Sequence, residues 1–149
     1  MRTRIFAAFC SVACVLAVSA VAASTADQAV LARQSALKTI ARTFKEIHGV
    51  HDVNAQRALL VADAARLKTL APQPWSYFGP ETAGATLKNE ALPVIWSNPA
   101  GFQAAKTKLI DAVASLDAVA ATGAPDLVEQ KIAAVGASCG GCHKAFRAK

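Results

Sequence analysis

The chain has 149 residues, 54% of them hydrophobic, and a formal net charge of +6, which suits one domain with one core and is too short for two. Its sixteen lysines and arginines are scattered singly, without runs or interleaved aromatic residues, so the sequence does not predict a nucleic-acid-binding surface. We therefore expect a single domain and no nucleic-acid partner.

The amino-terminal segment has the order of a secretory signal peptide. Arg2 and Arg4 precede an apolar run over residues 5–18, and the small residues of VSAVAAST follow. The apolar run is shorter than a membrane-spanning helix requires, so no stable membrane insertion is expected. We predict that this segment directs the chain to the periplasm. Cleavage is predicted after Ala23, which gives a signal peptide over residues 1–23 and a mature domain over residues 24–149.

The cleavage site has two alternatives, Ala22 and Ala26. Removing the signal peptide takes away two basic residues together with Cys10 and Cys14, which leaves fourteen basic residues, ten acidic residues and a net charge of +4. Cys14 is a poor candidate for lipid attachment because the residues before it do not match that signal. The cysteine chemistry of the mature chain then rests on its last two cysteines.

Two helices joined by a tight turn are predicted first. Apolar residues at helical spacing predict a helix over Asp27–Ile47 and a second over Val53–Ala71. Gly49 breaks the pattern between them, and Asp52 can accept hydrogen bonds from the amides that open the second helix. The predicted buried faces hold Val30, Leu37, Ile40, Phe44 and Ile47 on the first helix and Leu60, Ala64, Leu67 and Ala71 on the second.

One long loop follows over residues 72–99. It contains five prolines, two glycines and both tryptophans, and proline removes amide donors and prevents a continuous helix. A loop of this length needs its own side chains to hold it in a compact domain. Trp75, Phe78 and Trp96 are the predicted packing anchors.

Two more helices are predicted after the loop. Asn98 followed by Pro99 is a favourable helix start, and Gly123 ends that helix. Pro125 starts the last helix, which runs to about Phe146. The predicted buried face of the third helix holds Phe102, Ala105, Leu109, Ala112, Leu116 and Val119. No segment alternates as a strand does, so the fold class predicted is all-α, an antiparallel four-helix bundle with one long crossing connection.

The last helix carries the motif Cys139-Gly-Gly-Cys142-His143. Its inward positions advance in steps of three and four residues, through Val128, Ile132, Val135, Cys139, Cys142 and Phe146, so both thiols face the core. Two thiols spaced in this way and followed by histidine are the pattern for covalent haem c, in which the imidazole binds the iron. We predict one haem c per chain, attached through Cys139 and Cys142, with His143 as the metal ligand.

Three other interpretations of the motif are open. A thioredoxin-like redox pair would need a strand before it, and here the motif ends a helical chain. A disulfide between residues three apart would close a very small loop and leave His143 unexplained. Zinc needs four ligands, and only His48 or His51 could supply an imidazole as the fourth.

Three stretches of the mature chain resemble the cytochrome c′ family, the class II c-type cytochromes. They are RQSALKTIARTF at residues 33–44, LPVIWSNPAGF at residues 92–102 and VGASCGGCHKAFR at residues 135–147. The resemblance implies a four-helix bundle whose haem motif lies near the carboxyl terminus. It also implies frequent pairing as a homodimer through the first two helices.

The iron's sixth position decides what such a protein does. The only methionine is Met1, which leaves with the signal peptide, so no methionine ligand is available. The resemblance places Leu37 over the vacant side, which implies a five-coordinate, high-spin iron. It further implies that Arg33, Gln34 and Glu90 approach the haem propionates, although Val94 stands where an acidic residue is common.

The resemblance also implies that Arg147, four residues after His143, lies beside the proximal side of the haem. Two functions follow, electron transfer with periplasmic redox partners and binding of the diatomic gases nitric oxide and carbon monoxide. The alternative is a gas-binding or nitric-oxide-protective protein without an electron-carrier role. No catalytic residue is predicted, since the chain has no placed distal histidine or arginine that could act on a peroxide.

Overall fold

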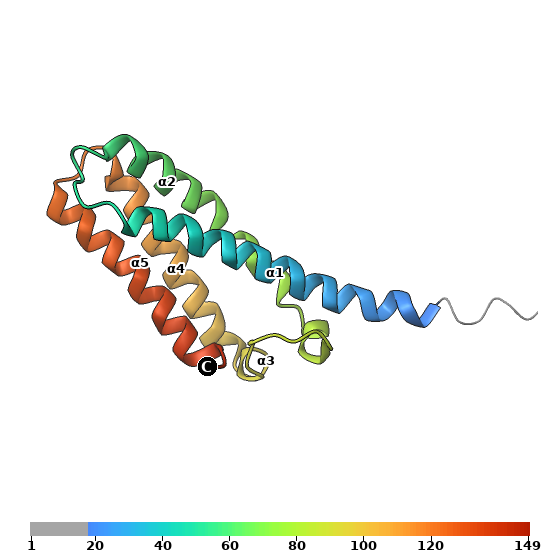
Figure 1. Ribbon diagram of the computed structural model, residues 1–149. Helices are drawn as coiled ribbons and strands as arrows, with labels where there is room; N and C mark the ends of the chain where they lie inside the picture. The colour runs from blue at the N-terminus through green and yellow to red at the C-terminus, as the bar shows by residue number, and fades with distance from the viewer. Residues whose placement is uncertain (1–17) are drawn as a thin grey trace, which may run out of the picture.

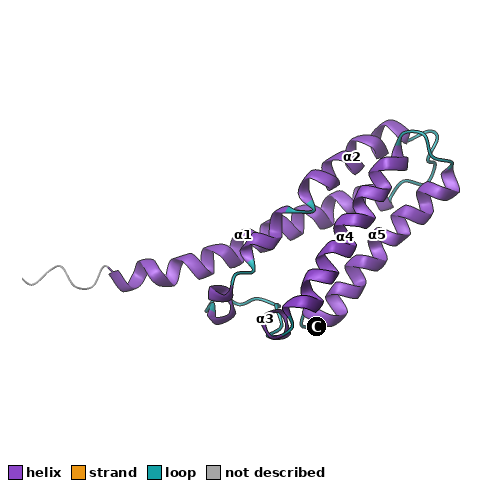
Figure 2. Cartoon of the chain, turned by 180° about the vertical axis from the view of Figure 1, so that it is seen from behind, coloured by secondary structure: helices purple, strands orange, loops and turns teal. Residues whose placement is uncertain are grey.

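A computed structural model describes residues 18–149, with side chains from Thr25 onward (Figure 1). Four long helices, α1, α2, α4 and α5, form the body, and three short turns, η1, η2 and α3, lie between α2 and α4. Figure 2 shows only helices and loops in this part of the chain, which confirms the all-α class. The bounds are α1 Val18–His48, α2 Arg57–Leu70, η1 Gln73–Tyr77, η2 Pro80–Gly84, α3 Val94–Ser97, α4 Pro99–Ala120 and α5 Pro125–Phe146.

The long helices form the predicted antiparallel bundle. Short turns join α1 to α2 and α4 to α5, and the long connection crosses between the two pairs (Figures 1 and 2). Each helix buries one apolar stripe in the shared core, as an amphipathic helix must. The buried residues of this core are Ile40, Ile47, Val53, Leu60, Ala64, Leu67, Ala71, Leu109, Val113, Leu116, Ala120, Val128, Ile132 and Val135.

α1 begins at Val18, nine residues before the predicted start, and its first turns project beyond the other helices (Figure 1). The added residues are rich in alanine, the strongest helix former. The predicted cleavage after Ala23 falls in this projecting part, and residues 1–17 lie outside the described residues. The signal peptide and the domain boundary therefore stay predictions. None of the helices within residues 18–149 combines the length and apolarity needed to cross a membrane.

The second helix begins at Arg57, later than the predicted Val53. The Asp52 carboxylate accepts hydrogen bonds from the amides of Asn54 and Ala55, each 3.0 Å long. Its predicted role as an acceptor is confirmed, but the bonds close a tight turn and the regular helix starts only after it. All four residues predicted for the buried face of this helix, Leu60, Ala64, Leu67 and Ala71, are buried.

The connection over residues 72–99 is more regular than the predicted loop, because it contains η1, η2 and α3. A proline lies at or just before the start of each turn, where the lack of an amide hydrogen costs nothing. The aromatic anchors are confirmed. Phe78 packs on Phe102 with ring centroids 5.0 Å apart, and Trp75 packs on both rings. Trp96 donates its ring N–H to the carbonyls of Phe78 and Gly79 at 3.2 Å.

The starts of α4 and α5 agree with the sequence. Asn98 accepts a 3.0 Å hydrogen bond from the Gly101 amide, and Pro99 is the first residue of α4. Pro125 opens α5. The buried stripe of α4 was predicted with the wrong rotation in part: Val113 and Ala120 are buried, whereas Ala105, Ala112 and Val119 are only half-buried. The adjacent pairs Ala112–Val113 and Val119–Ala120 are apolar at both positions, so hydropathy could not show which member of each pair is buried.

A second, smaller core lies at the carboxyl-terminal end of α5. It consists of Ile95, Phe102 and Phe146, with Trp75, Phe78 and Cys142 packed against it. Phe102 and Phe146 meet edge to face with centroids 5.3 Å apart. This aromatic cluster holds the long connection against α4 and α5, next to the cysteine motif.

Candidate functional site

The two cysteines lie on the inward stripe of α5, as predicted. Cys139 packs against the main core and Cys142 against the aromatic cluster. Both are free thiols and only half-buried, whereas Val135 on the same stripe is 1% exposed. The inward face of α5 is thus less completely covered by protein at the motif than one turn before it.

Leu37 on α1 lies level with the motif. α1 and α5 run antiparallel and touch at Phe44 and Gly136, where a Cβ atom on the glycine would lie 3.4 Å from the Phe44 ring. Leu37 lies seven residues before Phe44, and His143 lies seven after Gly136. At the helical rise per residue, both are about 10 Å along their helices from the contact. The ribbons of α1 and α5 diverge in this direction (Figure 1), and Leu37 is half-buried on α1.

Arg33 is the most buried charged residue of this region, with 2% of its surface exposed. Its guanidinium donates to Thr82 Oγ1 at 3.3 Å and to Asn89 Oδ1 at 2.7 Å. It also lies 4.7 Å above the centre of the Phe78 ring, a cation–π contact. Burial lowers the pKa of Arg33 from its ordinary value. The partners within the described residues are neutral, so the positive charge has no carboxylate to balance it.

Gln34 is the next residue of α1, and it helps to hold the segment Thr86–Asn89 against the helix. Its side-chain amide donates to the Lys88 carbonyl at 3.3 Å. Further along the segment, Asp27 accepts from the Thr86 hydroxyl at 2.8 Å and from the Leu87 amide at 2.9 Å. Three side chains of α1 therefore fasten this segment beside Arg33.

The Asp27 tie predicts a pH-dependent stability. The Leu87 amide, followed by the Thr86 hydroxyl, lowers the pKa of Asp27 below its ordinary 3.8. Because the folded pKa is lowered, the ionised carboxylate stabilises the fold above pH 3.8, and this contribution is lost as pH falls through the folded value. We expect Asp27→Asn to unfold at a lower urea concentration than wild type at neutral pH, with the difference vanishing in acid. Asp111→Asn, at an exposed aspartate without an ion pair in the described chain, should show no such difference.

His143 follows the cysteines and lies near the positive charge of Arg147 and the negative charge of Glu90. Burial of part of its imidazole lowers its pKa first, the Arg147 charge lowers it further, and Glu90 acts in the opposite direction. The imidazole is therefore neutral at neutral pH, the form that binds a metal. Arg147 donates from Nε to Glu90 Oε2 at 2.6 Å.

The thiols are in an apolar setting that disfavours thiolates. Burial raises the pKa of Cys139, although hydrogen bonding with Ser138 lowers it in part. Burial also raises the pKa of Cys142, and the charge of Cys139 raises it further. A zinc site at the motif would use both cysteines as thiolates. Within residues 18–149, no group of three or more His, Cys, Asp or Glu side chains is arranged to hold a metal ion.

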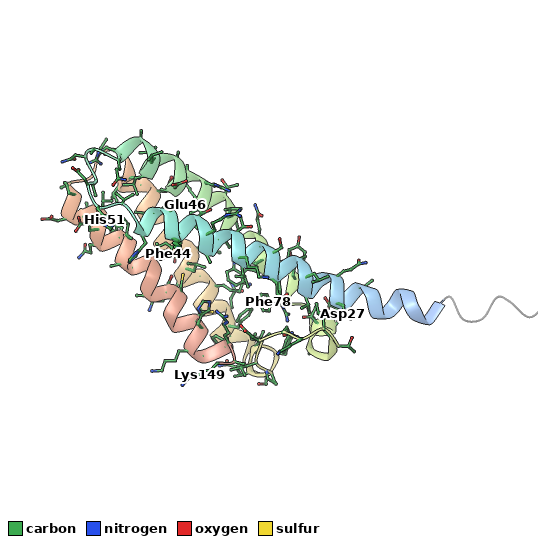
Figure 3. All side chains as sticks on the ribbon, viewed as in Figure 1. Asp27, Phe44, Glu46, His51, Phe78 and Lys149 are labelled. Atoms are coloured by element: carbon green, nitrogen blue, oxygen red, sulfur yellow. The ribbon has the colours of Figure 1, made fainter. Side chains whose placement is uncertain are left out.

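The remaining alternatives also lack support in the described chain. Figure 3 places His51 at the opposite end of the bundle from Lys149, so it cannot complete a zinc site with the motif. His48 ends α1 at that same far end, and its ring packs at a tilt against Phe44 with centroids 5.9 Å apart. The cysteines form no disulfide, and the motif lies within α5 without the preceding strand that a thioredoxin-like pair requires.

The residues that surround the motif suit a large, mostly apolar cofactor that carries carboxylates. Cys139, Cys142 and Leu37 present incompletely covered apolar surface. Arg33 is buried without an acidic partner, and a buried charge of this kind calls for an anion. The ring N–H of Trp75 is buried without a hydrogen-bond partner in the described structure, which leaves a free donor in the same region.

Three residues that the resemblance places near the haem propionates have different partners in the structure. Arg33 and Gln34 both contact the segment over residues 88–89, whereas Glu90 pairs with Arg147 and has no bond to either of them. The partner of Arg33 is Asn89, which sequence reasoning missed. The sequence signal that could have pointed to Asn89 was its position next to Glu90. A loop has no periodicity, so the sequence could not show which of these two adjacent polar residues faces α1.

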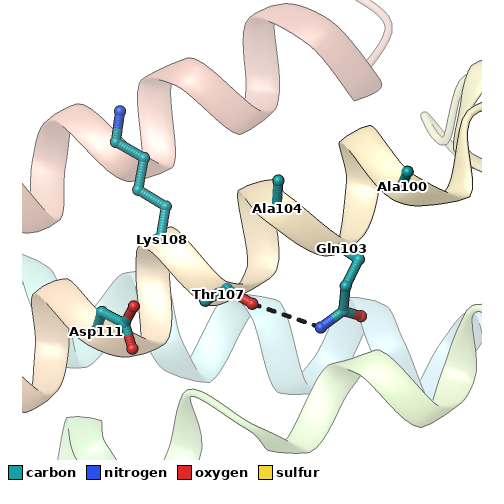
Figure 4. Close-up of a pocket in the computed structure, with 6 residues that line it drawn as sticks. All are labelled: Ala100, Gln103, Ala104, Thr107, Lys108 and Asp111. Atoms are coloured by element: carbon teal, nitrogen blue, oxygen red, sulfur yellow. Dashed lines mark hydrogen bonds between the residues drawn. The ribbon is translucent and has the colours of Figure 1, made fainter.

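Two surface hollows lie elsewhere. The larger, about 640 Å³, is a shallow depression on α4 lined by small and polar side chains (Figure 4). Within it, Gln103 donates to Thr107 Oγ1 at 3.4 Å, and Lys108 and Asp111 bound it along the helix. The smaller, about 340 Å³, lies over the aromatic cluster and includes Trp75. Neither hollow contains the cysteines or His143.

Comparison with known proteins agrees with this geometry. The sequence profile of the family described as Cytochrome C' matches residues 28–147. A cytochrome c′ of Alcaligenes xylosoxydans xylosoxydans is 38% identical over 125 residues, which cover 83% of this chain and 95% of the relative. A cytochrome c′ of Rubrivivax gelatinosus is 36% identical over 119 residues, or 78% of this chain and 92% of the relative.

Solved structures give the same result. The nitric oxide complex of a leucine-to-alanine variant of cytochrome c prime from Alcaligenes xylosoxidans has a TM-score of 0.74 at 36% identity, covering 83% of this chain and 96% of that chain. A carbon-monoxide-bound leucine-to-glycine variant of the same protein has a TM-score of 0.74 at 35% identity, covering 85% and 98%. The chain therefore belongs to the cytochrome c′ family, whose members carry covalently bound haem c.

Proposed function

We propose that this chain is an exported haem c protein that binds nitric oxide and carbon monoxide and exchanges electrons. Cys139 and Cys142 would hold the haem through thioether bonds, and His143 would be the sole protein ligand of its iron. The observation that carries the proposal is the position of Leu37, a half-buried apolar residue of α1 at the same level along the bundle as His143 of α5.

Each residue of the site has a part in this proposal. The haem supplies an iron that changes oxidation state and accepts a diatomic ligand. Leu37 offers no ligand atom to the iron and limits the size of what can approach. In this proposal Arg33, Gln34 and the unpaired N–H of Trp75 would meet the haem carboxylates. These donors would orient the haem, and the haem carboxylates would balance the charge of Arg33, which has no acidic partner in the described chain.

A second candidate function is gas binding without an electron-carrier role. The apolar position of Leu37 favours it, because an iron that gains and loses an axial ligand must reorganise at each electron transfer. The nitric oxide and carbon monoxide complexes of the relative support gas binding in either case. We assign no catalytic turnover, since a leucine on the open side cannot donate to or accept from a bound peroxide.

Location and assembly belong to the same proposal. Export to the periplasm is supported by the predicted signal peptide and by the haem c motif. Leu31 on α1 and Leu59 on α2 are 54% and 63% exposed, and they lie on the two helices through which the predicted homodimer would form. Exposed leucines on adjacent helices support that pairing. The positive charge of the mature chain suits acidic redox partners.

Visible absorption spectra of the purified protein test the proposal. We expect a reduced spectrum without sharp, split α and β bands, and a large change on adding carbon monoxide. Sharp bands that do not respond to carbon monoxide would mean a sixth ligand from the protein and would refute the open site. Stopped-flow rates of reduction by a small electron donor and of nitric oxide association then separate the two functions. Reduction much slower than nitric oxide association favours gas binding without an electron-carrier role.

A further inference from the structure

The segment over residues 86–92 of the long connection is attached to two helices. Side chains of α1 hold its first half. Its last residue is held at the other side, where the Leu92 amide donates to the Phe146 carbonyl at the end of α5 at 3.1 Å. Asn89 lies between these two attachments, so its backbone is fixed relative to both α1 and α5.

The side-chain amide of Asn89 uses its oxygen and its nitrogen for different partners. Oδ1 accepts from the Arg33 guanidinium at 2.7 Å and from the Ala91 amide at 3.1 Å. Nδ2 donates to the Leu87 carbonyl at 3.0 Å. A carboxylate could accept the first two bonds, but it would place its second oxygen against the Leu87 carbonyl, where a donor is needed. The position therefore suits a neutral amide whose oxygen is fixed toward Arg33.

The other contacts of Arg33 are neutral as well. The Thr82 hydroxyl donates to the Gly79 carbonyl at 2.7 Å, and its oxygen accepts from Arg33 at 3.3 Å. The two acids closest to this arrangement along the chain have other partners, because Asp27 accepts from the segment itself and Glu90 forms an ion pair with another arginine. None of the ion pairs within the described chain includes Arg33. Neutral acceptors thus hold the guanidinium in one place and leave its charge uncompensated by the protein.

We propose that Asn89 is a positioning residue that holds the Arg33 guanidinium toward the haem with its charge intact, and so raises the midpoint potential of the iron. This inference rests on the proposed haem-binding function. Reduction adds one electron to the iron, so a fixed positive charge nearby favours the ferrous form. Burial strengthens this effect, because a charge away from water is screened less. Without the Asn89 oxygen, the guanidinium is expected to turn away and to favour the ferrous form less.

The test compares the midpoint potentials of haem-loaded proteins, measured by spectroelectrochemical titration. Asn89→Leu keeps the approximate shape and the neutral charge of the side chain but removes the acceptor. We expect its potential to fall, with the ratio of ferrous to ferric protein at a fixed solution potential lowered about threefold to tenfold, the size of a coupling between residues in contact. A tenfold change for one electron corresponds to about 59 mV. Because the substitution alters no charge, such a shift indicates a displaced Arg33.

Two further comparisons isolate the role of the guanidinium. In the Arg33→Gln background, Asn89→Leu should change the potential no further. The matched control is Asn54→Leu, since Asn54 Oδ1 also accepts from a guanidinium, that of Arg57, at 3.0 Å. Asn54 lies three residues after His51, at the end of the bundle opposite Lys149 (Figure 3). Its substitution should leave the potential at the wild-type value.

Two results would overturn the proposal: an unchanged or raised potential in Asn89→Leu, or a shift of the same size with and without Arg33, which would assign the effect to the loop. Thermal unfolding shows whether each variant is intact. If Asn89→Leu does not fold, Asn89→Ala removes the same acceptor and carries the same expectations. The potential is measured in haem-loaded protein whether or not it binds nitric oxide, so a loss of gas binding and a failure of this inference are separate results. A wild-type chain without haem would refute both.

Discussion

Replacing both Cys139 and Cys142 with alanine is expected to give an exported chain with the mass of the bare polypeptide. Each thioether bond needs a thiol, and Cys139 and Cys142 are the cysteines of the described chain. Each single variant should keep one thioether bond and hence a haem that survives denaturation. Mass spectrometry of the unfolded protein measures this directly, since only covalently held haem remains with the chain.

The matched control for this experiment is Ser138→Ala. Ser138 is as buried as the core residues, adjoins Cys139, and donates its hydroxyl to the Val135 carbonyl at 2.7 Å. Its loss should perturb the same turn of α5 without removing a thiol, so the variant should keep its haem. A double-cysteine variant that still carries the mass of the cofactor would refute attachment at these positions. A wild-type chain without added mass would refute the haem itself.

The motif could be predicted from sequence because its geometry is local. Within one helix, the spacing of Cys139, Cys142 and His143 fixes how they lie relative to one another, and the apolar residues before them fix which side faces the core. The helix starts at Pro99 and Pro125 were predictable for the same reason, since capping depends on adjacent residues. Such features need no knowledge of the rest of the fold.

Features that depend on contacts between distant segments could not be predicted in this way. Arg33 is separated from Thr82 and Asn89 by 49 and 56 positions, and helical periodicity at Arg33 carries no information about either partner. Glu90 pairs with Arg147 across 57 positions, a contact that helical periodicity likewise could not predict. The path of the connection between η2 and α3 decides these pairings, and its prolines and aromatic anchors determine that path.

The buried arginine links the fold to the site. A cation with 2% of its surface exposed and only neutral partners in the described chain would be costly in a finished core. A haem carboxylate within reach of Arg33 would remove that cost, and the unpaired N–H of Trp75 could donate to the same carboxylate. We therefore expect the region around Arg33 to be less stable without the cofactor than with it, which would explain why Arg33 is tolerated on the inward face of α1.

Truncating Leu37 to alanine should speed the binding of nitric oxide and carbon monoxide by about tenfold to a hundredfold. If the leucine fills the space above the iron, an entering ligand must push it aside, and such crowding in a packed site costs about 1–3 kcal/mol. Each 1.4 kcal/mol or so removed from a barrier raises a rate about tenfold. Stopped-flow association measured over a range of gas concentrations gives the rates.

Leu31→Ala is the control, because Leu31 lies on the same helix but is 54% exposed, and its loss should leave both association rates unchanged. Truncation of Leu37 should raise the association rates of both gases. Shortening the side chain from four carbons to one relieves crowding without adding a polar contact. Equal rates in wild type and Leu37→Ala would show that Leu37 does not cover the iron.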